Sequence, residues 1–177
     1  KPIWRLTKPG RHILGMVSSG PMFGMTVTGV PFLMPLTDPL RATRVSISAD
    51  LSVVIPLLLR TSAAGAVILI HSDRPDVWRP LCDNHYRISL ASDRDPVRQP
   101  TVIVADGEGL ALTAGERGHS LVTLGSVDSE ADLTIVQESP DELVIGTPAV
   151  RGVRLSVMRP RNEAQFLTHL RTGALRP

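Results

Sequence analysis

Residues 43–71 read T-R-V-S-I-S-A-D-L-S-V-V-I-P-L-L-L-R-T-S-A-A-G-A-V-I-L-I-H, and this stretch decides the fold class. It predicts a strand at 44–48, a helix over about 50–64 that ends at Gly65, and a strand at 66–71. A strand, a helix and a strand in this order form a β-α-β unit, in which a crossover helix joins two parallel strands. Such units bind the phosphates of nucleotides in many enzymes, so the loop between strand and helix is the first candidate site.

That loop, I-S-A-D-L-S at 47–52, lacks the residues of a phosphate site. Phosphate loops need glycines that expose backbone N–H groups, and usually a lysine as well. Here there is neither, and the carboxylate of Asp50 would repel a phosphate. We expect Ser48, Asp50 or Ser52 to cap the helix instead. The sequence therefore predicts the scaffold of a nucleotide-binding fold without its phosphate site.

The rest of the chain predicts a mixed α/β pattern around this unit. A Gly- and Pro-punctuated stretch at 22–34 is typical of a β-hairpin. Further strands are predicted at 87–91, 101–106, 120–125, 132–137, 142–146 and 153–158, with helices at 75–81 and 161–171. We predict an α/β fold, a Rossmann-like sandwich with a mostly parallel sheet, an N-terminal β-hairpin and a β-rich C-terminal fringe. Strands 44–48, 66–71 and 101–106 should be neighbours at the sheet centre, because each is a continuous apolar run.

With 177 residues, the chain is long enough for one compact domain. We expect a linker or edge segment at 1–11 and a single α/β domain at 12–177. Within the domain we expect a hairpin region at 12–40, a β-α-β core at 41–106 and a β-rich part with a terminal helix at 107–177. The chain begins at Lys1 without the profile of a signal peptide, so we expect a piece of a longer protein. Its apolar runs are far shorter than the roughly 20 residues of a membrane-spanning helix.

Composition and charge bear on the partner class. Aromatic residues make up 3% of the chain, so a base-stacking surface is hard to build and we expect no nucleic-acid partner. Residues 101–145 carry a net charge of −8, which leaves +10 for the rest of a chain whose total is +2. This asymmetry predicts an acidic face and a basic face. Nucleic-acid binding by Arg41, Arg44 and the arginines of 151–161 stays open as a weaker hypothesis, which predicts salt-dependent affinity.

An enzymatic alternative depends on three carboxylates. The D-G-E-G at 106–109 follows a predicted strand, and Asp106 and Glu108 could hold Mg²⁺ there together with Asp50. This gives the alternative of a Rossmann-like nucleotide-binding or Mg²⁺-dependent enzyme domain. Asp-Gly is itself a strong turn signal, so a plain turn is the favoured interpretation.

No other residues form a recognisable catalytic or metal pattern. Cys82 is the single cysteine, and a buried helical thiol is a simpler interpretation than a nucleophile paired with His85. The histidines lack metal-ligand spacing. They are His12, His71, His85, His119 and His169. We therefore expect no catalytic residue, no cofactor, no metal site and no enzymatic activity.

Two segments, V-P-F-L-M-P-L at 30–36 and L-R-T-S-A-A-G-A at 59–66, lie in a region of about 13–80 that resembles the C-terminal part of EccE. EccE is a membrane component of the type VII (ESX) secretion systems of mycobacteria. The resemblance implies a non-enzymatic structural or interaction domain that contributes to assembly or stability of the secretion complex. It also implies partners of the EccB, EccC and EccD type, N-terminal transmembrane helices outside this sequence, and a place on the cytoplasmic side of the inner membrane. The motor ATPase of that complex is EccC, so an EccE-like domain needs no phosphate loop.

If the domain works by contact, its interface residues should be large and exposed. Tryptophan, methionine and arginine are enriched where proteins meet. The candidates are Met22, Phe23 and Met25 on the hairpin, and Arg74, Trp78 and Arg79 around the short helix at 75–81. A buried tryptophan at position 78 is the alternative.

Overall fold

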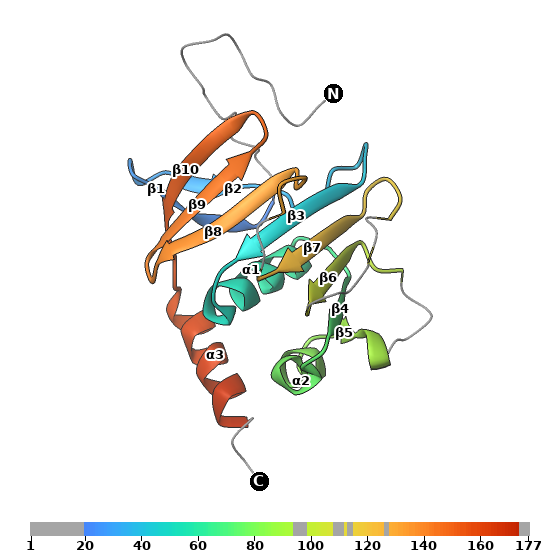
Figure 1. The fold of residues 1–177 in the computed structure, drawn as a ribbon. Helices are drawn as coiled ribbons and strands as arrows, with labels where there is room; N and C mark the ends of the chain where they lie inside the picture. The colour runs from blue at the N-terminus through green and yellow to red at the C-terminus, as the bar shows by residue number, and fades with distance from the viewer. Residues whose placement is uncertain (1–19, 94–98, 108–111, 113–114, 126–127, 174–177) are drawn as a thin grey trace.

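The computed structural model describes residues 20–93, 99–107, 112, 115–125 and 128–173. Within these ranges ten strands form one mixed sheet in the order β2-β1-β10-β9-β8-β3-β7-β6-β4-β5. The strands are β1 (Met22–Thr26), β2 (Pro31–Leu33), β3 (Thr43–Ser48), β4 (Ile68–Ser72), β5 (Ile88–Leu90), β6 (Val102–Asp106), β7 (Ser120–Leu124), β8 (Leu133–Ser139), β9 (Glu142–Thr147) and β10 (Val150–Ser156). The helices are α1 (Leu51–Ala63), α2 (Pro75–Asp83) and α3 (Arg161–Gly173), with a short 3-10 helix η1 (Ala91–Asp93). In Figure 1 the three α-helices lie below the sheet.

The sheet has a parallel half and an antiparallel half that meet at β8. Strands β8, β3, β7, β6, β4 and β5 run parallel to one another. On its other side β8 pairs antiparallel with β9, and β10, β1 and β2 continue the antiparallel half. The α/β class, the mostly parallel sheet, the hairpin at 22–34 and a β-rich C-terminal third are therefore confirmed.

The predicted strand order is only partly correct. Strands β4 and β6 are neighbours as expected, but β7 lies between β6 and β3, so the three predicted neighbours are not adjacent. The predicted central place of β4 is also wrong, because only the edge strand β5 lies beyond it. A continuous apolar run indicates that both faces of a strand are covered, and it does not say which strands lie beside it.

Helix α1 matches the predicted 50–64 closely, and its C-terminal end has a clear signal. Gly65 has a φ of +109°, and the N–H groups of Gly65 and Ala66 donate to the carbonyls of Ser62 and Thr61. These two bonds form a Schellman motif, which ends the helix. At the other end Asp50 is the N-cap residue, but its side chain makes no capping hydrogen bond. The expected side-chain cap is therefore wrong; instead the Asp50 N–H donates to Gln137 Oε1 at 2.8 Å.

One apolar core joins the helices to both halves of the sheet. Val45 and Ile47 of β3 are buried together with Leu57 and Leu58 of α1. The same cluster includes residues of the hairpin, of α2 and of β8 to β10, among them Phe23, Trp78, Leu81, Ile135, Leu143 and Leu155. The parallel and antiparallel halves therefore share one core.

Arg60, in the last turn of α1, connects three parts of the antiparallel side. Its side chain is 12% exposed and pairs with Glu163 of α3, Nε donating to Oε1 at 2.8 Å and Nη2 to Oε2 at 2.5 Å. Nη1 donates to the Met22 carbonyl at 2.7 Å, and Nη2 to the Met158 carbonyl at 3.1 Å. One guanidinium therefore fastens β1 and the start of α3 to α1.

Candidate functional site

The carboxyl ends of β4 and β6 form the position where open α/β sheets bind ligands. From β4 the chain runs through α2 to β5 on one side, and from β6 it runs to β7 on the other. A crevice between strands whose connections leave in opposite directions is the usual binding place in such sheets. The residues at this position are Ser72 at the end of β4 and Asp106 at the end of β6, which are register partners. Asp73, Arg74 and Gly107 follow them.

The Asp106 carboxylate belongs to a residue that is 4% exposed, and it receives four hydrogen bonds from this chain. Arg74 donates through Nη2 to Oδ1 at 2.8 Å and through Nε to Oδ2 at 2.9 Å. Oδ2 also accepts from Ser72 Oγ at 2.8 Å and from Trp78 Nε1–H at 2.6 Å. Trp78 is fully buried. Side chains of the β4–α2 segment therefore fill the place that a ligand would take beside Asp106.

A glycine lets the two loops approach each other at this point. A Cβ on Gly107 would lie 2.9 Å from the Asp73 carboxyl carbon, closer than real Cβ atoms come. The Asp73 N–H also donates to the Asp106 carbonyl at 3.3 Å. Gly107 thus permits a close approach between the two loops, while residues 108 and 109 of the predicted turn lie outside the described residues.

Burial alone would raise the pKa of the Asp106 carboxyl. The hydrogen bonds from Arg74, Trp78 and Ser72, with the charge of Arg74, outweigh burial and hold this pKa below its ordinary value. The hydrogen bond to Asp106 in turn raises the pKa of Arg74. Asp106 is therefore ionised at neutral pH and acts as an acceptor within the fold, with no proton to donate to a substrate.

This lowered pKa predicts a pH dependence of stability. A carboxyl with a lower pKa in the folded than in the unfolded chain adds stability that is complete above the unfolded pKa of about 4 and is lost as pH falls through the folded pKa. We expect Asp106→Asn to be destabilised at pH 7, and the difference from the unsubstituted protein to shrink below about pH 4. Urea unfolding at several pH values measures this. Asp93→Asn, which removes an exposed carboxylate paired with Arg79, is the matched control and should change little. A constant Asp106→Asn deficit from pH 7 to pH 3 would contradict the assignment.

Of the three carboxylates of the enzymatic alternative, the two that the structure describes, Asp50 and Asp106, lie apart. Asp50 is exposed and follows β3, two strands away from β6, which corresponds to a lateral separation of about 10 Å. Asp106 already has its four protein donors, and Glu108 lies outside the described residues. Within the described part of the chain no group of three or more His, Cys, Asp or Glu residues could hold a metal ion.

A hollow lies beside Asp50, at the carboxyl ends of β3 and β8. It measures about 450 Å³ and is lined by Ser48, Ala49, Asp50, Gly125, Gln137, Glu138, Ser139 and Pro140. Two features make it unsuited to phosphate. Asp50 and Glu138 are acidic, and the Asp50 N–H already donates to Gln137. This agrees with the conclusion from the loop sequence.

The predicted interface residues divide into a buried group and a group that is half-buried or exposed. Trp78 and Phe23 are buried, at 0% and 1% exposed. For Trp78 this confirms the buried alternative, and for Phe23 the expected exposure is wrong, because a side chain large enough to anchor an interface also fills a core. Met22 and Met25 are half-buried, and Arg74 and Arg79 are exposed but paired with Asp106 and Asp93. The hairpin and α2 lie at opposite ends of the sheet (Figure 1).

The exposed apolar residues of the hairpin were missed by the sequence interpretation. Val27 is 88% exposed and Val30 is 37% exposed, and both belong to the turn that joins β1 to β2. Gly29, at φ +76°, sits between them. The sequence interpretation chose interface residues by type, as tryptophan, phenylalanine, methionine and arginine, so it did not select valine. The Thr28-Gly29 pair within the predicted hairpin nevertheless indicated where its turn would lie.

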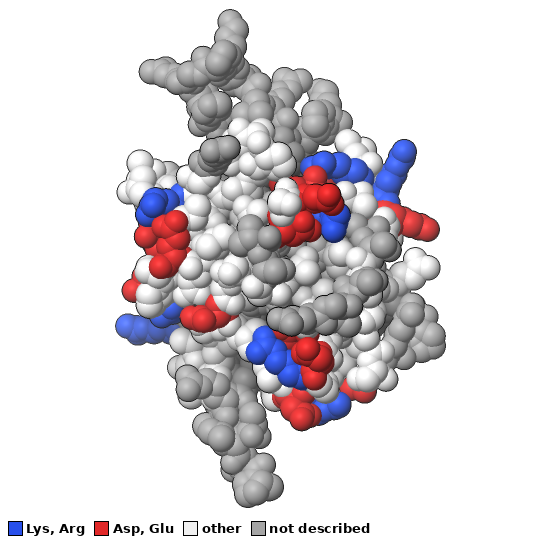
Figure 2. Space-filling view, viewed as in Figure 1, with Lys and Arg blue, Asp and Glu red and all other residues white. Residues whose placement is uncertain are grey.

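Among the described residues, the acidic stretch 128–142 does not form a face of one charge. The acids of 128–142 pair with arginines elsewhere in the chain: Arg41 with Asp132, Arg44 with Asp128 and Glu130, Arg154 with Glu138 and Glu142, and Arg159 with Asp141. Figure 2 shows basic and acidic side chains in adjacent groups on this face. The fold brings the two charge-rich parts of the sequence together, which weakens the interpretation of Arg41 and Arg44 as phosphate contacts.

Cys82 lies in helix α2, as expected, and is half-buried. Burial, with the nearby charges of Asp83 and Asp93, raises the pKa of its thiol to about 11, so the thiol is protonated at neutral pH. His85 has a lowered pKa through burial and the charge of Arg87, and its Nδ1 lies 3.5 Å from Ser62 Oγ. Neither residue has the geometry of a nucleophile with its base.

Of the helices in the described ranges, none has the length and apolar character that crossing a bilayer requires. No protein-family model, no curated protein and no solved structure matches the chain. The geometry of the carboxyl edge and of the exposed hairpin is therefore what bears on function.

Proposed function

We propose that this chain is a non-enzymatic interaction domain that supports assembly of a type VII secretion membrane complex. The proposal rests on one observation: side chains of this chain already fill the ligand position between β4 and β6. Its one buried carboxylate, Asp106, is bound by Arg74, Trp78 and Ser72 of the same chain. A position used in this way stabilises the fold, and function is then expected at the surface.

The family resemblance of residues 13–80 supports the same proposal. The region covers the hairpin and the β3-α1-β4 unit, so the elements that carry the resemblance are also those with the exposed apolar tip. The proposed partners are EccB-, EccC- and EccD-like subunits. The proposed location is the cytoplasmic side of the inner membrane, with attachment through N-terminal helices outside this sequence. A Rossmann-like arrangement is likewise proposed, because the chain connections reverse between β4 and β6.

The hairpin surface, defined as Met22, Met25, Val27 and Val30, is the proposed contact with a partner subunit. Its members are apolar, range from half-buried to 88% exposed, and lie on one two-stranded element at the sheet edge. Pro31, in the edge strand β2, lacks an N–H to donate to an added strand. The contact is therefore expected to use side chains of the hairpin.

We expect Val27→Asp with Val30→Asp to reduce recovery of the protein in the membrane complex about tenfold or more. Burying a charge at the centre of an interface exceeds the roughly 1.4 kcal/mol that a tenfold change requires. The measurement is co-purification of the tagged full-length protein with the complex from an actinobacterial host. Leu40→Asp, at a position 54% exposed outside the hairpin, is the matched control and should stay in the complex.

Circular dichroism and thermal melting should show that each variant remains folded. Recovery of the double variant at the level of the unsubstituted protein would place the contact elsewhere, and the acidic stretch 128–142 would be tested next.

Calorimetric titration with ATP, GTP and dinucleotides in the presence of Mg²⁺ tests the proposal that the domain is non-enzymatic. Low-micromolar binding of any of them would overturn it.

A further inference from the structure

A small cavity lies at the opposite end of the parallel strands, where the chain enters β3. Its volume is about 20 Å³. The lining residues come from the segment before β3, from β3 itself and from the start of β8: Pro35, Leu36, Thr37, Asp38, Arg41, Thr43, Asp132 and Leu133. This is the volume open to the centre of a water-sized sphere, and roughly 10–15 Å³ of it is needed to hold one water molecule. The cavity therefore has room for one water and not for an organic ligand.

Thr43 is one of the lining residues, and its hydroxyl is unusual. Thr43 is 8% exposed, and its Oγ1 has no hydrogen-bond partner among the described residues. The backbone N–H of the same residue is paired, donating to the His119 carbonyl at 3.0 Å. A buried hydroxyl without a partner is costly, and such groups in native proteins are usually satisfied by an ordered water.

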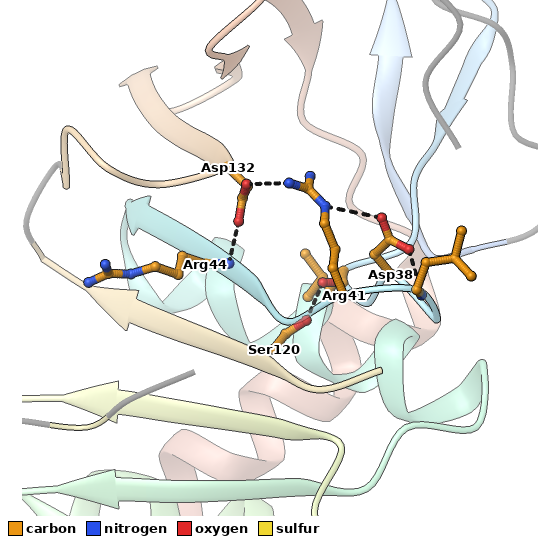
Figure 3. Close-up of polar contacts among 7 residues, drawn as sticks. Asp38, Arg41, Arg44, Ser120 and Asp132 are labelled. Carbon is orange, nitrogen blue, oxygen red and sulfur yellow. Dashed lines mark hydrogen bonds and ion pairs between the residues drawn. The ribbon is translucent and has the colours of Figure 1, made fainter. Parts of the chain in front are cut away.

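Acceptors for a water are held in the same lining by a fixed network. Arg41 lies between two carboxylates, with Nε donating to Asp38 Oδ2 at 3.2 Å and Nη1 donating to Asp132 Oδ1 at 2.8 Å (Figure 3). The Leu40 N–H donates to Asp38 Oδ1, and the Arg44 N–H donates to Asp132 Oδ2, both at 2.9 Å. Each carboxylate oxygen has about two acceptor sites, so both groups can accept a further hydrogen bond.

We propose that this cavity binds one internal water molecule, which bonds to Thr43 Oγ1 and donates to a carboxylate of the Asp38–Arg41–Asp132 network. Such a water links the first residue of β3 to the segment before it and to the start of β8. The proposal concerns the fold and stands whether or not the domain belongs to a secretion complex. Water is favoured over a cation because the Arg41 guanidinium lines the same cavity and offsets part of the carboxylate charge.

The sign of one substitution tests the proposal. Thr43→Val keeps the shape of the side chain and removes the hydroxyl. With a water bound, the substitution removes one of its few partners, and we expect the melting temperature to fall by about 2–4 °C. If no water binds, the substitution removes an unpaired hydroxyl from an apolar contact, and the melting temperature should rise. A rise would overturn the proposal.

Two further measurements test directly for a bound water and for a bound cation. In a ¹⁵N-labelled sample, the Thr43 amide should show a direct Overhauser effect to a water of long residence, and this effect should disappear in Thr43→Val and persist in Thr43→Ser. Absence of the effect in the unsubstituted protein would overturn the proposal. Replacement of sodium chloride by choline chloride at equal ionic strength should leave the melting temperature unchanged; a fall on removing sodium would assign the cavity to a cation instead.

Discussion

Replacing Trp78 with alanine is expected to lower the free energy of unfolding by about 3–5 kcal/mol. The side chain is fully buried between α2 and the sheet, and its Nε1–H donates to Asp106 Oδ2 at 2.6 Å. The substitution leaves a large cavity and removes one of the donors that compensate a buried carboxylate. Urea unfolding followed by far-UV circular dichroism measures the loss.

Trp78→Phe separates the two contributions. Phenylalanine keeps most of the ring volume and removes only the N–H, so we expect a smaller loss, about 1–3 kcal/mol, from the lost hydrogen bond to a charged group. Asp106 would keep its bonds from Arg74 and Ser72. A loss below about 1 kcal/mol for Trp78→Ala, far under the range for a buried tryptophan, would show that α2 does not pack on the sheet as described.

The second large effect is expected at Arg60. Arg60→Met keeps the aliphatic stem but leaves the Glu163 carboxylate and the Met22 and Met158 carbonyls without their donor. Removing one partner of a buried ion pair costs about 3–5 kcal/mol. The side chains of Arg60 and Glu163 are 12% and 20% exposed, so water screens part of their interaction. We therefore expect Arg60→Met to lower the free energy of unfolding by about 2–4 kcal/mol.

A double-mutant cycle with Glu163→Gln measures the coupling of the pair. We expect Arg60→Met and Glu163→Gln together to cost clearly less than the sum of the single substitutions, because the second substitution removes the charge that the first leaves unpaired. Amide exchange should accelerate in β1 and in the first turn of α3. If the two losses in free energy of unfolding are strictly additive, the ion pair contributes nothing to holding α3 against α1.

Features encoded within a few neighbouring residues were predicted well from the sequence. Helix α1 was placed within about one residue because Asp50 and Gly65 mark its ends. The hairpin followed from its glycines and prolines. Each of these signals lies inside the element that it predicts.

Features that depend on distant residues were not predicted. The sequence indicated Asp106 and Arg74 separately, as a metal ligand and as an interface residue, whereas in the fold they bind each other. The adjacency of β4 and β6 was expected, but neither local pattern states that the Arg74 side chain will reach the Asp106 carboxylate. The insertion of β7 between β3 and β6, and the pairing of acidic residues 128–142 with arginines elsewhere, were missed for the same reason.

The position of β3 in the sheet also constrains how the chain folds during synthesis. Both neighbours of β3 come from late in the sequence, β7 at Ser120–Leu124 and β8 at Leu133–Ser139. A nascent chain on the ribosome that has emerged only through β6 thus has its first parallel strand unpaired on both edges. Such long-range pairing slows folding and exposes strand edges to aggregation in the meantime. The β3-α1-β4 unit, which looks self-contained in the sequence, is therefore not an independent folding unit, and truncation before residue 120, which removes both β7 and β8, should leave β3 without either neighbour.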